Sequence, residues 1–209
     1  MVAVRMSIIT CLFACLPTLC LAGPVAWELG GIYTAHSSSG FIGNWSQGVG
    51  ASLGAMYQIS PRVDLILHSS YLRYPYKGGN VEGVSIPECR ENWSGSTSSG
   101  VAFGAEVRLI EPGTHKRFRG FLSFQFDVQR FDFGRVMINW SCIYGDPSHG
   151  TRVHSESDQA TIYGLLSLGL GQSIRLWSDK RIVIQSGFGV DDRLSRVQLP
   201  VSVSLQFGG

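Results

Sequence analysis

The sequence predicts an all-β chain that closes into an eight-stranded, antiparallel, up-and-down transmembrane β-barrel. Three observations support this prediction. The last thirteen residues, 197–209, alternate between apolar and polar positions, as expected of a strand with one apolar and one polar side. Seven further segments show the same alternation over lengths sufficient to cross a bilayer. The connections between the segments are short at one end and longer at the other, which is typical of outer-membrane barrels.

The length of the alternating segments favours a membrane barrel over a soluble sandwich. In a sandwich, the apolar side of each strand would face a core. A tilted strand needs roughly 9–11 residues to cross a bilayer, whereas soluble strands have roughly five or six. The segments are 25–36, 45–58, 63–74, 97–110, 118–131, 159–176, 181–190 and 197–209. The apolar positions are Val25, Trp27, Leu29 and Tyr33 in 25–36; Trp45, Val49, Ala51, Leu53, Ala55 and Tyr57 in 45–58; and Val63, Leu65, Leu67 and Tyr71 in 63–74. They are Val101, Phe103, Ala105, Val107 and Leu109 in 97–110; Phe118, Leu122, Phe124, Phe126 and Val128 in 118–131; and Ile162, Leu166, Leu168, Leu170, Ile174 and Leu176 in 159–176. The last two segments have Ile182, Ile184, Phe188 and Val190 in 181–190, and Val197, Leu199, Val201, Val203, Leu205 and Phe207 in 197–209.

The connections predict the orientation of the barrel. Those at 59–62, 111–117 and 177–180 are short and contain the turn-forming residues Pro, Gly, Ser and Asp. The connections at 75–96 and 132–158 are long and polar, while 37–44 and 191–196 are of intermediate length. Short turns on the periplasmic rim and longer loops outside the cell would place both termini in the periplasm.

The first 22 residues predict a secretory signal peptide, which leaves 23–209 as the barrel domain. Arg5 supplies a positive start, an apolar stretch follows, and Ala22 is a small residue at a plausible cleavage point. A transmembrane anchor fits less well, because the apolar run is short and interrupted by Pro17. A lipoprotein signal ending at Cys15 is also less favoured, since the apolar run continues beyond it.

Composition argues against a nucleic-acid partner. The formal charge is +2, and the first segment contributes only Arg5 to it, so the exported part is close to neutral and lacks a strongly basic balance. Twenty-six glycines and only 15% charged residues fit a β-rich wall better than a helical enzyme.

The polar side of the strands predicts a barrel interior filled by side chains. An eight-stranded barrel is just wide enough to be filled in this way, and opposite charges inside it must pair. Glycines on the same side leave room for long arginine side chains. A filled interior predicts no open pore. The charged residues expected inside are Glu28, Asp64, His68, Glu106, Arg108, Arg119, Asp127 and Arg175.

Two parts of the chain resemble the small bacterial outer-membrane barrels of the OmpA-like and OmpX-like kind. These parts are the strand–turn–strand segment 50–65 and the terminal strand, whose insertion signal the resemblance places at Val201, Val203, Leu205 and Phe207. The resemblance implies an outer-membrane location, contact with outer-membrane lipid and lipopolysaccharide, and recognition by the barrel-insertion machinery. The terminal strand is expected to close against the first strand around Trp27. Pro200 within it predicts a β-bulge near the outer rim.

Two cysteines remain after the expected signal peptide, Cys89 and Cys142, one in each long connection. Both connections lie on the same side of the predicted barrel, and the exported route is oxidising. The sequence therefore predicts a disulfide between them, with two unpaired loop thiols as the alternative.

Three classes of function are compatible with such a barrel. The favoured class is a structural or surface-interaction protein that meets an extracellular ligand through 75–96 and 132–158. The second is a porin-like conduit for small molecules. The third is a lipid A-modifying enzyme, which would need a nucleophile, a base and an acid in contact. His68, Ser70 and Asp64 share one polar side, but this pattern is more typical of an interior network, so no catalytic residue, cofactor or metal is predicted.

Overall fold

The computed structural model of the chain describes residues 26–37, 47–76, 79–82, 89–112, 117–132, 134–142, 150–155, 160–177, 179–191 and 197–208. The predicted signal peptide, 1–22, lies outside these residues. The described residues form the strands β1 (Ala26–Ser37), β2 (Gln47–Ser60), β3 (Val63–Tyr74), β4 (Gly79–Glu82), β5 (Cys89–Gly95), β6 (Ser98–Ile110), β7 (Phe118–Asp132), β8 (Arg135–Cys142), β9 (Gly150–Ser155), β10 (Ala160–Arg175), β11 (Lys180–Asp191) and β12 (Val197–Phe207). Among the described residues, no helix is long and apolar enough to cross a membrane.

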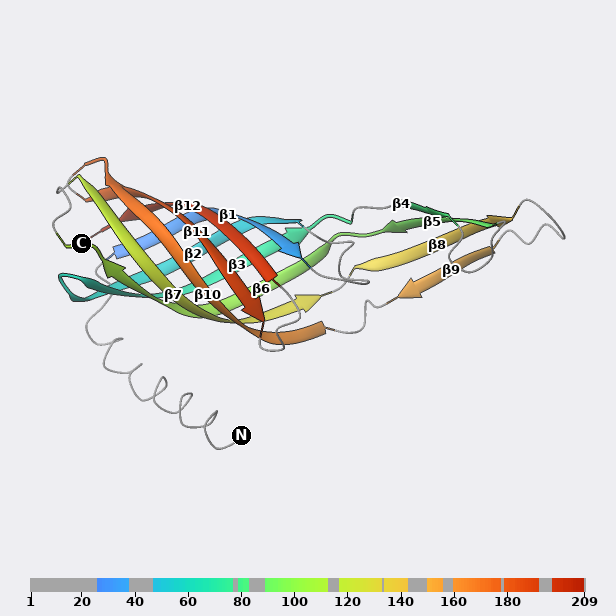
Figure 1. The fold of residues 1–209 in the computed structure, drawn as a ribbon, viewed down its shortest axis with the longest axis horizontal. Coiled ribbons are helices and arrows are strands. Elements are labelled where there is room, and N and C mark those ends of the chain that lie inside the picture. Colours follow the sequence, from blue (N-terminus) through green and yellow to red (C-terminus); the bar gives the residue numbers. More distant parts are fainter. Residues whose placement is uncertain are drawn as a thin grey trace, which may run out of the picture.

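Eight of the strands close into one antiparallel barrel, as predicted (Figure 1). The order around the wall is β1-β12-β11-β10-β7-β6-β3-β2, and their bounds agree with the predicted segments to within two residues. The barrel closes where β12 pairs with β1, with Phe207 directly opposite Trp27. This pairing confirms the closure expected for the terminal strand.

The described parts of the long connections contain strands, which the sequence does not predict there. Within 75–96 lie β4 and β5, and within 132–158 lie β8 and β9; these four strands form a second antiparallel sheet in the order β4-β5-β8-β9. Figure 1 shows this sheet extending beyond one rim of the barrel as a single layer. We call this rim the sheet end, and the opposite rim, at which β1 begins and β12 ends, the turn end.

The register of β12 shows no bulge at Pro200, so the predicted bulge is wrong. Pro200 is paired with Thr34 of β1, and the pairs of β12 with β11 have one register on both sides of it. Only the pairs of Pro200 and Leu199 with β11 are missing, consistent with a residue that has no N–H to donate. The register shift in the wall lies elsewhere, between Gln58 and Ser60 of β2.

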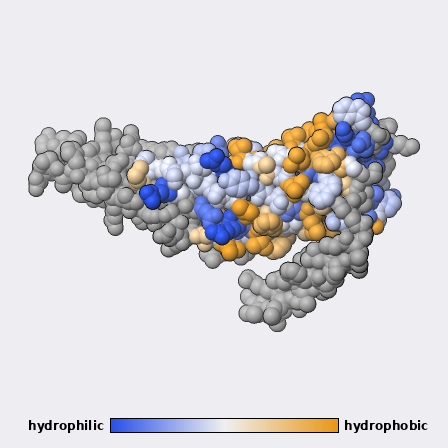
Figure 2. All heavy atoms as spheres, turned by 180° about the vertical axis from the view of Figure 1, so that it is seen from behind, coloured by the Kyte–Doolittle hydropathy of each residue, from blue (hydrophilic) through white to orange (hydrophobic). Residues whose placement is uncertain are grey.

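The barrel wall is apolar on its outside and polar on its inside. Large apolar side chains from all eight barrel strands are exposed, and they gather over the wall in Figure 2. Leu170, for example, is 67% exposed. The buried side chains include many polar and charged ones: Glu28, Thr34, Asp64, Ser98, Glu106, Arg108, Ser123, Asp127, Gln129, Ser173, Asp191, Gln198, Ser204 and Gln206. This arrangement is the reverse of a soluble barrel and suits a wall surrounded by lipid.

Candidate functional site in the barrel interior

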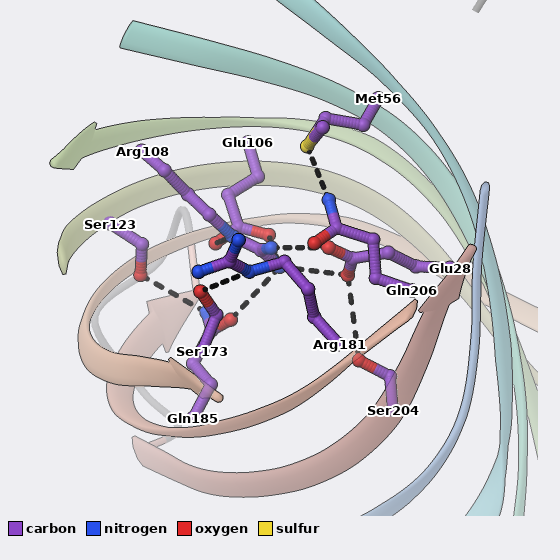
Figure 3. Close-up of polar contacts among 10 residues, drawn as sticks. All are labelled: Glu28, Met56, Glu106, Arg108, Ser123, Ser173, Arg181, Gln185, Ser204 and Gln206. Atoms are coloured by element: carbon purple, nitrogen blue, oxygen red, sulfur yellow. Dashed lines mark hydrogen bonds and ion pairs between the residues drawn. The ribbon is translucent and has the colours of Figure 1, made fainter. Parts of the chain in front are cut away.

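A buried arginine organises the middle of the barrel interior. Arg108 of β6 is 6% exposed and lies between two carboxylates, Glu28 of β1 and Glu106 of β6 (Figure 3). Its Nη1 and Nη2 atoms donate to Glu28 at 2.5 and 3.0 Å, while Nε and Nη2 donate to Glu106 at 2.9 and 3.1 Å. The guanidinium also lies 4.7 Å from the centre of the Phe121 ring, a cation–π distance. The guanidinium thus receives the partners that a buried charge requires.

Amides and hydroxyls from other strands extend this network. Gln185 accepts a hydrogen bond from Arg108 Nη2 at 3.3 Å and donates one to Ser123 at 3.0 Å. The Ser204 hydroxyl donates to Glu28 at 3.5 Å. These contacts link β1, β6, β7, β11 and β12 across the interior (Figure 3).

His68 and Asp127 meet beside a glycine. In the wall, His68 of β3 is opposite Gly104 of β6, and Gly104 is opposite Asp127 of β7. His68 Nε2 lies 3.2 Å from Asp127 Oδ1. A β-carbon on Gly104 would contact Asp127 Oδ1 and the Phe126 carbonyl oxygen at distances too short for any real side chain. The missing side chain at Gly104 therefore leaves the space in which the imidazole and the carboxylate meet.

Neutral side chains fill the interior toward the sheet end. Gln129 donates to the Tyr74 hydroxyl at 3.2 Å, and Gln198 donates to the Tyr163 hydroxyl at 3.2 Å and to Gln129 at 3.4 Å. The Tyr74 and Phe131 rings pack with their centroids 4.9 Å apart. These contacts join β3, β7, β10 and β12 across the interior.

The turn end of the interior holds a basic pocket with a volume of about 210 Å³. Its charged lining includes Arg119 of β7, Arg175 of β10 and Arg181 of β11, together with Asp64 of β3. Arg181 Nε donates to Ser173 at 3.1 Å. Arg175 and Arg181 are directly opposite one another in the wall, so two like charges are cross-strand neighbours.

The structure places the eight charged residues predicted for the interior in these three groups. Arg108, Glu28 and Glu106 lie together, and His68 lies with Asp127. Asp64, Arg119 and Arg175 line the basic pocket. Sequence reasoning missed several interior partners, although each lies on the polar side that strand alternation predicts. These residues are Tyr74, Ser123, Gln129, Tyr163, Ser173, Arg181, Gln185, Gln198, Ser204 and Gln206.

The second sheet brings together the two cysteines for which a disulfide is predicted. Cys89 of β5 is directly opposite Cys142 of β8, so both cysteines lie in strands and not in loops. The register then continues regularly to the pair of Gly95 with Val136. Whether the two thiols are joined stays a prediction.

The described residues contain no group of three or more His, Cys, Asp and Glu side chains that could hold a metal ion. His68 has a carboxylate as its close partner. No hydrogen bond connects His68 to a serine hydroxyl among the described interior residues.

Comparison with known proteins shows the fold. No protein-family model matches the sequence, and no curated protein sequence matches it. Among solved structures, Neisserial surface protein A (NspA) aligns with 88% of this chain and 96% of its own, at 11% identity and a TM-score of 0.54. Ail, the attachment invasion locus protein of Yersinia pestis, covers 88% and 97% of the two chains at 11% identity and a TM-score of 0.45. The N-terminal β-barrel domain of Pseudomonas aeruginosa OprF covers 88% and 99% at 16% identity and a TM-score of 0.37. With its apolar outer wall and polar interior, this chain therefore has the fold of the small eight-stranded outer-membrane barrels.

Proposed function

We propose that this protein is an integral outer-membrane barrel whose second sheet, β4-β5-β8-β9, is a surface for binding an extracellular protein. The turn end would face the periplasm and the sheet end the outside of the cell, because short turns and long extensions are distributed in this way in outer-membrane barrels. The apolar outer wall would contact membrane lipid and lipopolysaccharide. The terminal strand would carry the signal for the insertion machinery.

The single observation that carries the binding role is the register of the second sheet. Trp93 is opposite Ile138, and Glu91 is opposite Trp140. By their place in this register, Trp93, Val136, Ile138 and Trp140 share one set of alternating strand positions with Val81, Glu91, Arg152 and His154. Arg90, Asn92, Met137, Asn139 and Ser141 occupy the other set of positions, with Val153 opposite Met137. Tryptophan is enriched among the residues that dominate binding at protein interfaces.

The barrel interior supports a binding role over transport. The layer formed by Tyr74, Gln129, Tyr163 and Gln198 crosses the lumen near the sheet end. The network around Arg108 crosses it lower down. A conduit for small molecules would require both layers to move aside. The hydrogen-bonded interior therefore favours a role as support for the sheet outside.

A cell-binding experiment tests this proposal. Cells producing the wild-type protein, a Trp93→Ser/Trp140→Ser variant and an Asn92→Ser/Asn139→Ser variant are applied to an array of immobilised extracellular proteins. The tryptophan variant is expected to lose binding to a target that wild-type cells retain, because it removes the two tryptophans proposed to make the main contacts. The asparagine variant changes two directly paired residues of the other set of positions and is expected to bind normally.

Surface display of each variant is measured with an antibody, so that a loss of binding is compared at equal amounts of protein. Equal binding by the tryptophan variant and the wild type would contradict the proposal. Binding no greater than that of cells lacking the protein would contradict it as well.

A further inference from the structure

We infer that the basic pocket at the turn end binds an oxyanion, a single phosphate or carboxylate group that arrives from the aqueous phase. This inference goes beyond the role proposed for the second sheet and depends only on the barrel. Three guanidinium groups, those of Arg119, Arg175 and Arg181, line a pocket inside the barrel wall.

The wall places these arginines close together, and within the described residues no ion pair joins any of the three to a carboxylate. Arg175 and Arg181 form a directly opposed cross-strand pair, and Arg119 is opposite Ser173, two residues before Arg175. Like charges directly opposite one another in a sheet are destabilising. An anion between the three groups would convert this repulsion into attraction.

The carboxylates nearby do not neutralise the three arginines. Glu28 and Glu106 each form an ion pair with Arg108. Asp64 and Asp179 also line the pocket, but no ion pair joins either of them to an arginine among the described residues. The Oδ1 atom of Asp64 has no hydrogen-bond partner there either.

Donors of the pocket are also left unused. Arg175 Nε and Arg181 Nη2 are buried atoms without a hydrogen-bond partner within the described part of the chain. Buried donors are almost always hydrogen-bonded, and guanidinium groups are suited to phosphate and carboxylate because they donate from a planar fork. Unused donors on two neighbouring strands thus point to an acceptor that lies between them.

The position of the pocket restricts how the anion can reach it. The lining residues lie on the inner side of the wall, and Arg108 and Phe121 also line the pocket and contact one another. The barrel wall separates the pocket from the surrounding lipid, and Asp179 and Gly208 of the turn end complete its lining. The anion must therefore enter from the water at the turn end, as a free ion or as a charged group at the end of a larger molecule.

Isothermal titration of the folded, detergent-solubilised protein with inorganic phosphate, and separately with acetate, tests this inference. Wild-type protein is expected to bind at least one of the two anions saturably. An Arg175→Gln/Arg181→Gln variant is expected to bind it about tenfold more weakly or worse, because charge-assisted hydrogen bonds are lost. An Asp64→Asn variant is expected to bind more tightly, because it removes a competing negative charge. Arg62→Gln is the matched control, since Arg62 is an exposed arginine of the β2–β3 turn outside the pocket lining.

The two anions distinguish the source of the ligand. Tighter binding of phosphate supports a phosphorylated ligand, and tighter binding of acetate supports a carboxylate. Lack of saturable binding of either anion by the wild type overturns the inference, as does equal binding by the double variant. If the double variant does not fold, Asp64→Asn decides: unchanged or weaker binding overturns the inference.

Discussion

At the scale of single residues, the barrel interior depends on a few charges whose partners come from distant parts of the chain. Arg108 is the clearest case, because its partner Glu28 lies 80 residues away in the sequence. The other carboxylate, Glu106, lies two residues away on the same strand and therefore on the same side of the wall. One arginine thus holds two buried carboxylates that would otherwise repel one another.

Replacing Arg108 with methionine is expected to destabilise the barrel by about 3 to 5 kcal/mol, because it leaves two buried carboxylates without their cation. The measurement is urea unfolding of the protein in lipid vesicles, followed by tryptophan fluorescence. Combining Arg108→Met with Glu28→Gln and Glu106→Gln removes the unpaired charges and is expected to restore part of the stability. An Arg108→Met variant as stable as the wild type would show that the ion pairs do not hold the interior together.

At the scale of elements, the chain forms two kinds of strand: long strands in the barrel wall and short strands in the second sheet. In the barrel strands the alternation of residues produces an apolar outer side and a polar inner side over 11 to 16 residues. In β4, β5, β8 and β9 the strands have only 4 to 8 residues, too short to be recognised within connections rich in polar residues. Each pair of the second sheet follows a pair of the barrel: β4 with β5 follows β3 with β6, β8 with β9 follows β7 with β10, and β5 with β8 follows β6 with β7.

The pairing of β5 with β8 leads to a prediction for Cys89 and Cys142. Directly opposed residues of antiparallel strands have Cα atoms about 4.5 or 5.5 Å apart, and both values lie within the range of disulfides. We therefore expect a disulfide in the exported protein. Mass spectrometry of a non-reduced digest should find the two cysteines in one linked peptide pair.

A Cys89→Ala/Cys142→Ala variant is the control for that experiment and should lack the linked peptide. It should also be cleaved faster in the second sheet by protease added to whole cells, because a cross-link limits opening of the strands. Separate peptides with free thiols in the wild type would contradict the prediction.

At the scale of the whole molecule, the distribution of apolar and polar residues favours a lipid environment around the barrel wall. Exposed apolar residues occur on every barrel strand, while buried charges and amides lie inside. Figure 2 shows hydrophilic residues at the turn end, beyond the apolar wall. A closed sheet leaves no unpaired strand edge in the wall, and this closure allows strands to cross lipid.

Two whole-molecule measurements follow from a closed and filled barrel. The detergent-solubilised protein should migrate differently on a gel before and after boiling, because the closed barrel resists unfolding by detergent until it is heated.

In planar bilayers the protein should show no steady conductance, since two layers of side chains cross the lumen. Identical migration of boiled and unboiled samples would argue against closure, and a stable open channel would argue against the filled interior.

The sequence by itself determined the number of barrel strands, their bounds to within two residues and the side of the wall on which each residue lies. Periodicity suffices for these features, because side-chain direction along a strand depends only on position in the chain. It also identified eight charged residues of the interior, although it missed Arg181 and did not give the pairing partners. Pairing across the lumen depends on how the strands are staggered around the barrel, and only the closed structure specifies the contact of Arg108 with Glu28 or of His68 with Asp127.

The tertiary structure alone decided the form of the long connections, the position of Cys89 opposite Cys142 and the gathering of four arginines in one pocket. Each of these features depends on strand register, which is set by pairing between segments that are far apart in the sequence. Alternation within a segment contains no information about which residue of another segment lies opposite. The alternation of residues within each segment therefore determined the barrel wall, and pairing between distant segments determined the interior network, the cysteine pair and the basic pocket.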